Sequence, residues 1–419
     1  MLDLLRLVTA GSVDSGKSTL IGRLLFDSKQ IFDDQLAALQ EASIRRARGH
    51  LDLSLLTDGL RAEREQGITI DVAYRYFSTP KRKFVIADTP GHLQYTRNMV
   101  TGASTASLCV LVVEVDKELN EQTRRHVILA GLLGVRSLVV AVNKMDLVGF
   151  EEAPFARLRA WFEDFLRSLP YTDVTFIPTS ALLGDNIVRG SDAMPWYSGP
   201  ALLEHLEATP IGHERQFPHL RLPIQLVLRP DGSDHEERMY AGRLAGGNIR
   251  VGDEVVILPS NERTRVRSIV AAGAPVGEAS APASVAVALE DDLDISRGFM
   301  IASTDHPPLE MVEVSALVCW LGDRPLELGT RYAIKHTTQW SRVIVNAIEY
   351  RYDVNDLSNR EQATSLSANE IGCVCLVVTM PLFGDPYEAN RSTGSFILVD
   401  ESTNDTVAAG LIGGISPAG

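Results

Sequence analysis

A glycine-rich turn near the start of the chain reads Gly11-Ser-Val-Asp-Ser-Gly-Lys-Ser18. It follows an apolar run over residues 4–10 and leads into Thr19-Leu-Ile-Gly-Arg-Leu-Leu25, so the order predicts a strand, a loop and a helix. The spacing fits G-x-x-x-x-G-K-[ST], in which backbone N–H groups curl around phosphate oxygens at a helix N-terminus. The turn, called the phosphate loop below, therefore predicts a site for a nucleoside triphosphate.

The side chains of the phosphate loop have separate expected roles. Lys17 reaches the outer phosphates, and Ser18 offers its hydroxyl to Mg²⁺, because a hard cation prefers oxygen ligands that it shares with nucleotide phosphates. The alternative is an ordinary glycine turn, which the flanking strand and helix disfavour. We expect the other nucleotide contacts here from Gly11, Ser12, Val13, Asp14, Ser15, Gly16 and Thr19.

A second motif, Asp88-Thr-Pro-Gly-His92, follows the apolar run Lys83-Phe-Val-Ile-Ala87. A carboxylate at a strand end opposite the phosphate loop can hold Mg²⁺, usually through water, and Gly91 can donate its N–H to the γ-phosphate. D-x-x-G is weak evidence by itself, and its place after the phosphate loop gives it weight. Asp88 is therefore a second expected metal ligand.

The segment between these motifs reads Glu63-Arg-Glu-Gln-Gly-Ile-Thr-Ile-Asp71. In a nucleotide switch, a loop threonine completes the Mg²⁺ shell while the γ-phosphate is present and leaves after hydrolysis. Taken alone, the segment is an acidic loop before an alternating strand over residues 72–77. Its position between the two motifs predicts Thr69 as a third metal ligand.

A third motif, Asn143-Lys-Met-Asp146, follows the apolar run over residues 137–142. N-K-x-D at a strand end is the pattern that recognises guanine. Asp146 accepts hydrogen bonds from the base N1–H and the exocyclic amine, and Asn143 bonds to the base and to the phosphate loop. The aliphatic part of the Lys144 side chain lies along the ring. Adenine cannot supply the paired donors, which discriminates strongly against it. The alternative is a plain polar strand end. Backbone expected to touch the guanine carbonyl follows the next strand, at Ser180, Ala181 and Leu182.

Composition indicates a globular protein of more than one domain. The 419 residues exceed one typical core, and 45% hydrophobic with 22% charged residues is ordinary for such a chain. A net charge of −14 argues against a broad nucleic-acid-binding surface. No stretch reaches the roughly 18 apolar residues of a membrane span. The four cysteines lie in apolar runs, which favours buried thiols in a reducing compartment, so we expect the cytoplasm.

The pattern changes along the chain from mixed to strand-rich. Alternating strands and helices predict a doubly wound, mainly parallel sheet in a nucleotide-binding domain over residues 1–213. Within the amphipathic helix expected over residues 121–133, His126 is placed on the surface rather than as a ligand. Short alternating runs separated by turn residues then predict two antiparallel β-barrels, over residues 219–303 and 309–419. The expected fold class is multidomain α/β plus β.

Several stretches carry a family resemblance. They are Thr9-Ala-Gly-Ser-Val-Asp-Ser-Gly-Lys-Ser18, Leu60-Arg-Ala-Glu-Arg-Glu-Gln-Gly-Ile-Thr-Ile-Asp71, Gln94-Tyr-Thr-Arg-Asn-Met99, Thr101-Gly-Ala-Ser-Thr105, Met194-Pro-Trp-Tyr-Ser-Gly-Pro200, Asp294-Ile-Ser-Arg-Gly298 and Arg391-Ser-Thr-Gly-Ser-Phe396. With a nucleotide domain, two barrels and Asp-Thr-Pro-Gly-His, nearly the whole chain resembles the translation-factor class of P-loop GTPases. Within that class it is most similar to the large, GTP-binding subunit of bacterial sulfate adenylyltransferase.

The resemblance implies a heteromer. A separate small catalytic subunit, related to ATP pyrophosphatases, would transfer the adenylyl group of ATP to sulfate and give adenosine 5′-phosphosulfate and pyrophosphate. This chain would hydrolyse GTP to GDP and drive that unfavourable synthesis. By the same resemblance, His92 orients the attacking water, and Val13 and Ile68 form the apolar gate that controls its approach.

Departures from the family pattern lie near His92. Leu93 stands where Glu is usual, and residues 114–121 replace D-A-R-x-G-x-x-x-Q, although Gln122 keeps the later glutamine. These departures bear on hydrolysis and on coupling to the partner. A fused adenylylsulfate kinase is not expected, because the sequence has no second G-x-x-x-x-G-K-[ST]. Two alternatives remain open: an elongation-factor-like carrier of aminoacyl-tRNA, and a GTPase-fold scaffold without turnover.

Overall fold

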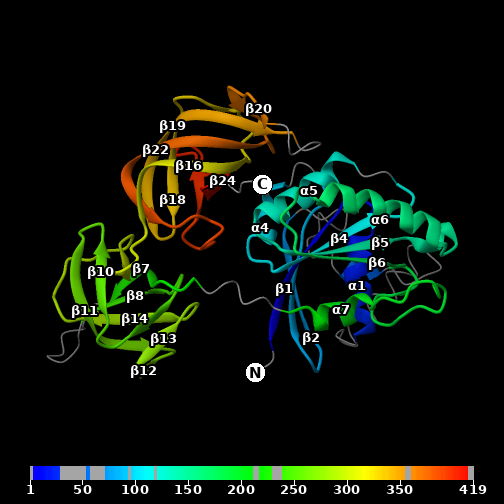
Figure 1. The fold of residues 1–419 in the computed structure, drawn as a ribbon, viewed down its shortest axis with the longest axis horizontal. Coiled ribbons are helices and arrows are strands. Elements are labelled where there is room, and N and C mark those ends of the chain that lie inside the picture. The colour runs from blue at the N-terminus through cyan, green and yellow to red at the C-terminus, as the bar shows by residue number, and fades with distance from the viewer. Residues whose placement is uncertain are drawn as a thin grey trace. The chain divides into compact units, whose positions relative to one another are not determined.

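The chain folds into two compact units. The computed structural model describes residues 3–28, 53–56, 71–92, 96–117, 120–210, 217–228, 238–353 and 360–413. The first unit consists of the described residues of 1–212, and the second of those of 213–353 and 359–416. The first is built of helices around a sheet, and the second of strands (Figure 1).

A six-stranded sheet in the order β2-β3-β1-β4-β5-β6 organises the first unit. The parallel strands are β1 (Leu4–Ala10), β3 (Lys83–Asp88), β4 (Leu108–Glu114), β5 (Ser137–Asn143) and β6 (Asp173–Pro178). The edge strand β2 (Ala73–Ser78) runs antiparallel to β3. Every residue of β4 is buried, as expected for a parallel sheet that is covered on both faces.

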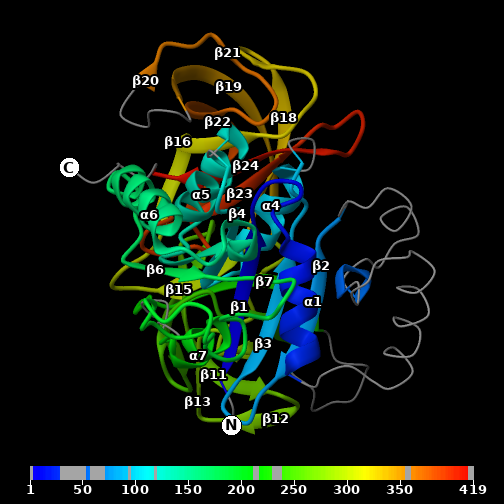
Figure 2. The same cartoon turned by 90° about the vertical axis from the view of Figure 1, so that its right-hand side faces the viewer.

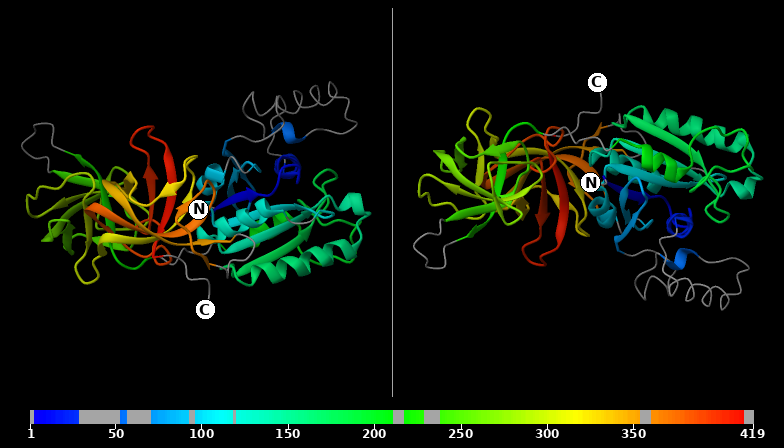
Figure 3. Two further views of the ribbon diagram at one scale, coloured as in Figure 1. Left: turned by 90° about the horizontal axis from the view of Figure 1, so that it is seen from above. Right: turned by 90° about the horizontal axis from the view of Figure 1, so that it is seen from below.

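Helices cover both faces of this sheet. On one face, α1 (Lys17–Asp27) and α7 (Leu202–Ala208) share a core with the strands, and Figure 2 shows α1 alongside β1 and β3. On the other face lie α4 (Thr96–Ala103), α5 (Glu121–Leu132) and α6 (Glu152–Leu166) (Figure 3). The short 3₁₀ helices are η1 (Leu53–Leu56) and η3 (Met145–Val148). Within the described ranges, none of the helices has the length and apolar character needed to cross a bilayer.

The second unit begins with a closed antiparallel barrel. Pairing of β10 with β11 closes a ring of β10 (Glu254–Leu258), β15 (Met300–Ser303), β7 (Arg221–Leu228), β8 (Met239–Arg243), β14 (Ser284–Leu289) and β11 (Glu262–Ala271). The short strand β12 (Ala274–Val276) pairs with β11, whereas β9 (Asn248–Arg250) and β13 (Glu278–Ser280) form a separate two-stranded sheet. Alternate residues such as Leu222 and Ile224 fill its core.

A second closed barrel follows. Pairing of β18 with β19 closes a ring of β18 (Arg331–His336), β23 (Ser395–Val399), β24 (Thr406–Ile412), β16 (Leu309–Trp320), β22 (Ile371–Gly384) and β19 (Gln339–Tyr352). The short strands are β17 (Leu326–Glu327), β20 (Arg360–Glu361) and β21 (Ser365–Leu366). The predicted fold class is confirmed, and the domain limits at residues 213–219 and 303–309 stay predictions.

A buried ion pair joins the two barrels. Arg221 of β7 is 1% exposed, and its Nε and Nη2 atoms donate to the two carboxylate oxygens of Asp385 at 3.0 and 2.8 Å. Thr393 donates to the same carboxylate at 2.6 Å, and Arg221 Nη1 donates to the carbonyls of Leu220 and His306, each at 2.9 Å. Both charges are therefore paired and hydrogen-bonded, which a buried ion pair requires.

Candidate nucleotide-binding site

The phosphate loop joins β1 to α1 in a backbone path that needs glycine. Gly16 has a φ of 91° and precedes the first residue of α1. A side chain there would collide with the Asn143 amide, and one at Gly11, whose φ is 142°, would collide with the carbonyl of Val112. The two glycines of the motif are thus required by backbone conformation and by close approach.

Lys17 places a buried cation inside this loop. Its Nζ donates to the carbonyl oxygens of Gly11 at 2.9 Å and Ser12 at 2.8 Å. Burial lowers the pKa of Lys17 to about 8, against the opposing attraction of Asp88 and Asp14. A poorly solvated ammonium that is held by backbone carbonyls is stabilised further by a phosphate oxygen, which gives it a full counter-charge.

The Asp88–His92 motif meets the phosphate loop. Asp88 ends β3 opposite Thr9 of β1, and the Thr9 hydroxyl donates to its buried carboxylate at 3.0 Å. A Cβ on Gly91 would lie 2.6 Å from Lys17 Nζ and 2.9 Å from the carbonyl oxygen of Gly11. The backbone at Gly91 therefore lies directly against the loop, where its N–H can face phosphate.

The expected metal ligands are only partly within the described residues. Ser18 lies in the first turn of α1 and is half-buried, and Asp88 stands at the end of β3. A hydroxyl and a carboxylate are the oxygen donors that Mg²⁺ prefers. Thr69 lies outside the described residues, as do Ile68 and Leu93.

His92 is exposed next to Gly91. The amide of Gln122, at the start of α5, donates to the carbonyl oxygen of Gly91. Gln122 therefore holds the peptide that leads into His92. Val13, one residue of the predicted apolar gate, is 37% exposed at the tip of the phosphate loop.

Asn143 connects three segments of the site. Its Nδ2 donates to the carbonyl oxygen of Ser15 at 2.8 Å, and its Oδ1 accepts from the N–H of Ala181 at 2.9 Å. The side chain is 2% exposed, so both bonds are shielded from water. The expected contact between the N-K-x-D motif and the phosphate loop is present.

The rest of the N-K-x-D motif lies beside the segment after β6. Asp146 accepts a hydrogen bond from the Ser180 hydroxyl at 2.6 Å, and Leu182 accepts one at its carbonyl from Arg23 of α1 at 2.6 Å. Lys144 Nζ lies 2.8 Å from a carboxylate oxygen of Glu114. The structure thus brings the phosphate loop, Asp88, Gly91 and these residues to the carboxyl ends of neighbouring parallel strands, where α/β sheets bind ligands.

One sequence-based placement is wrong: His126 is buried rather than on the helix surface, with 1% of its area exposed. Burial lowers its pKa to about 3, with smaller contributions from the positive charges of Lys17 and Arg125. The helix α5 buries Thr123 and every residue from His126 to Leu132. Its buried side is therefore wider than the amphipathic pattern predicts. A neutral imidazole therefore lies near the phosphate loop.

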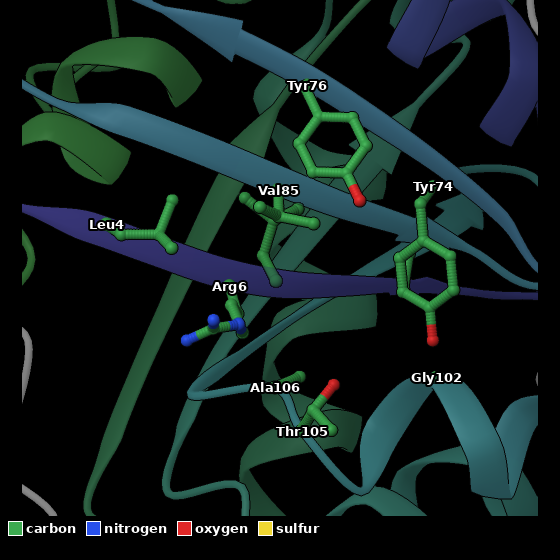
Figure 4. A pocket seen from close by; sticks show the side chains of 10 residues that line it. Leu4, Arg6, Tyr74, Tyr76, Val85, Gly102, Thr105 and Ala106 are labelled. Atoms are coloured by element: carbon green, nitrogen blue, oxygen red, sulfur yellow. The ribbon is translucent and has the colours of Figure 1, made fainter. Parts of the chain in front are cut away.

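A separate cavity of about 220 Å³ lies on the same sheet. Its walls include Leu4 and Arg6 of β1, Tyr74 and Tyr76 of β2, and Thr105 after α4 (Figure 4). Among the described residues that line it, none belongs to the phosphate loop or to the other predicted nucleotide contacts. This cavity is therefore distinct from the nucleotide-binding edge.

Comparison with known proteins gives the family. Residues 3–211 match the Elongation factor Tu GTP binding domain, and residues 313–413 match the GTP-eEF1A C-terminal domain-like family. The bifunctional enzyme CysN/CysC of Mycobacterium tuberculosis is 55% identical over 98% of this chain and 67% of its own length. Sulfate adenylyltransferase subunit 1 of Bacteroides fragilis is 50% identical over 98% of this chain and 86% of its own length.

A solved structure supports the fold. The GTPase-like domain of S. cerevisiae Ski7, bound to GDP and inorganic phosphate, aligns with a TM-score of 0.53 over 98% of this chain and 97% of that chain. At 20% identity this likeness concerns the fold alone. Because relatives at 50–55% identity match 98% of this chain, the chain belongs to the sulfate adenylyltransferase subunit 1 family, with a GTP-binding domain of the elongation factor Tu type.

Proposed function

We propose that this chain is the GTPase subunit of a sulfate adenylyltransferase, in which GTP hydrolysis drives synthesis of adenosine 5′-phosphosulfate. The observation that carries the proposal is the pair of hydrogen bonds made by Asn143. They join the phosphate loop at Ser15 to the segment of Ala181, so one site can hold both ends of a guanine nucleotide. The names of the relatives supply the reaction to which the nucleotide is coupled.

Guanine is the base that this edge fits. The carboxylate of Asp146 accepts one hydrogen bond from Ser180 and keeps capacity for two further donors, such as the N1–H and the amine of guanine. The backbone of Ser180, Ala181 and Leu182 would face the guanine carbonyl. The contacts over residues 11–19 would hold the phosphates, with the ammonium of Lys17 on the outer ones.

We infer Mg²⁺ as the second cofactor. Ser18 and Asp88 offer the oxygen donors that it prefers, and Thr69 would complete the set while the γ-phosphate is present. When bound, the ion neutralises charge on the β- and γ-phosphates. Around it, Thr9 holds the Asp88 carboxylate in place through its hydroxyl.

Hydrolysis depends on an ordered water at the γ-phosphate. His92 would orient that water, behind the apolar gate of Val13 and Ile68. The hydrogen bond from Gln122 to the Gly91 carbonyl fixes the peptide that carries His92. Catalysis of this kind is mostly positioning and electrostatic stabilisation, so the histidine can raise the rate without holding the nucleotide.

Adenylyl transfer would take place on another chain. The proposed partner is a small catalytic subunit of the ATP pyrophosphatase type, in the cytoplasm, and the proposed domains of this chain are residues 1–213, 219–303 and 309–419. Release of Thr69 and His92 after hydrolysis would change the contacts with that partner. Coupling of binding is reciprocal, so ATP and sulfate on the partner should alter the affinity of this chain for GTP.

The test is GTP turnover by the two-subunit complex, with and without ATP and sulfate. Turnover should rise when both substrates are present. His92→Ala should retain GTP affinity within about threefold and lower turnover by about 100-fold, in the range typical of a positioned acid–base group. Turnover that ignores the partner and its substrates would contradict the proposal, and equal rates for the parent and His92→Ala would favour a scaffold.

The alternative of an aminoacyl-tRNA carrier has less support, because the relatives at about 50% identity are named sulfate adenylyltransferase subunit 1. Retention of aminoacyl-tRNA on a filter distinguishes the two functions. A carrier would retain it with a steep dependence on salt, since phosphate contacts release counterions. The proposed GTPase subunit should show no retention above that of a protein of similar charge.

A further inference from the structure

A buried carboxylate stands beside the N-K-x-D motif. Glu114 ends β4, and the register of the sheet places it opposite Asn143, the last residue of β5. The pairing continues for one more residue, because the N–H of Val115 donates to the carbonyl oxygen of Asn143 at 3.1 Å. Glu114 is therefore fixed by the sheet itself next to the residue that precedes Lys144.

Lys144 turns back toward this carboxylate. Its φ of 66° and ψ of 34° lie in the left-handed region, which a residue with a side chain occupies only when its surroundings hold it there. Its Nζ lies 2.8 Å from Oε2 of Glu114, whose side chain is 8% exposed. Because Glu114 holds the ammonium at the end of the Lys144 side chain, the aliphatic part of that side chain has a defined direction.

A second lysine shares the same carboxylate. Lys117 Nζ lies 3.0 Å from Oε2 of Glu114, and this lysine also feels the negative charge of Asp14 in the phosphate loop. Burial alone would raise the pKa of Glu114, but the hydrogen bonds from Lys144 and Lys117 outweigh it and hold that pKa below its ordinary value. Glu114 is therefore an anion at neutral pH.

We propose that Glu114 is a positioning residue for guanine recognition, which fixes the Lys144 side chain as one wall of the base slot. This inference rests on the proposed function, in which the Lys144 stem lies along the guanine ring. Without the carboxylate, the lysine regains rotamer freedom that binding must then remove. The loss falls on the base end of the nucleotide and leaves the phosphate contacts unchanged.

The experiment measures release of a fluorescent GDP from the full chain by rapid mixing. Glu114→Gln, which keeps the shape but removes the charge, should release GDP about tenfold faster, the direction expected when one partner of a buried charge pair is removed. Lys144→Ala should do the same, and the double variant should match Lys144→Ala alone, because both changes remove one interaction. Inorganic triphosphate, which has no base, should compete equally well with all variants.

The matched control is another short ion pair in the same unit. Lys81 Nζ lies 2.8 Å from Glu207, and neither residue belongs to the nucleotide-binding edge, so Glu207→Gln should release GDP at the parent rate. Thermal melting of each variant separates loss of folding from loss of binding.

If the parent binds GDP and Glu114→Gln releases it at the parent rate, this inference is overturned and the proposed function is not. If the variants also weaken the binding of inorganic triphosphate to the same extent, the inference is overturned, because Glu114 would then act through Lys117 and the phosphate loop. A parent chain that does not bind GDP would overturn the proposed function as well.

Discussion

Replacing Asn143 with alanine removes two hydrogen bonds that link the parts of the nucleotide site. The amide donates to the carbonyl of Ser15 at 2.8 Å and accepts from the N–H of Ala181 at 2.9 Å, in surroundings where the side chain is 2% exposed. Alanine satisfies neither group. The phosphate loop then lacks the hydrogen bond that holds it in place. Part of the free energy of nucleotide binding must be spent on ordering the loop, so the affinity falls.

The size of the effect follows from those two bonds. A buried backbone group left without its partner costs about 1–3 kcal/mol. The bond to Ser15 is the one that orders the phosphate loop, so its loss alone should weaken GDP binding by about 5- to 150-fold. The bond to Ala181 adds a similar loss to the free energy of unfolding of the first unit. Direct contacts of Asn143 with the base would increase the loss of affinity further.

Titration calorimetry with GDP measures this change, and Asn390→Ala is the matched control. Asn390 is also buried, its amide donates to the carbonyl of Ala245 at 3.0 Å, and its Oδ1 accepts from the N–H of Ser392 at 3.0 Å. It lies in the barrel unit, so the control should lose stability and keep GDP affinity. A folded Asn143→Ala protein that binds GDP within twofold of the parent would refute the reasoning.

Three further results are expected. GDP affinity should fall by about tenfold for each pH unit above about 8, because burial lowers the pKa of Lys17 to about 8 and phosphate favours the charged form; a flat calorimetric profile from pH 7 to 9 would contradict this. Arg221→Met leaves the charge of Asp385 buried without its cation and should cost the barrel unit about 3–5 kcal/mol in urea unfolding; a cost below about 1 kcal/mol would show that water reaches the carboxylate. Burial raises the pKa of Cys109 to about 12 and of Cys373 to about 11, so both thiols should react with a disulfide reagent at pH 8 only after unfolding, and fast labelling of the folded chain would be inconsistent with the structure.

Much of the first unit could be predicted because its signals are local. The strand predicted over residues 4–10 is β1, and the helix predicted over residues 121–133 is α5 to within one residue. The phosphate loop could be located from spacing alone, since two glycines and a lysine at fixed separations satisfy one backbone path. The barrels could be predicted as a class from short alternating runs.

The features that escaped prediction depend on pairing between distant segments. Arg221 and Asp385 are 164 positions apart, and no local pattern marks either as the partner of the other. In the sequence, Glu114 is marked only as part of the segment that departs from the family pattern. Its contact with Lys144 follows from the register of β4 and β5. The strand β24 has no strong local signal, because its Ala and Gly residues have weak strand propensity.

Two cysteines show the limit of a period-two pattern. The apolar run around Cys373 and Cys375 predicts buried thiols, and both are buried. The interior of the barrel, however, holds the intervening Val374, while the thiols donate to Glu349 at 3.2 Å and Glu313 at 2.8 Å. Alternation in the sequence identifies two faces of a strand, and only the closed ring decides which face is the interior.

The most direct test of the account is the steady-state mass-action ratio of adenosine 5′-phosphosulfate and pyrophosphate to ATP and sulfate, measured with the two-subunit complex. If GTP hydrolysis at this site drives the synthesis, the ratio in the presence of GTP should exceed the ratio with GDP, and Asn143→Ala should reduce the difference at low GTP. The same ratio with GTP and with GDP, in a complex that makes adenosine 5′-phosphosulfate, would contradict the account.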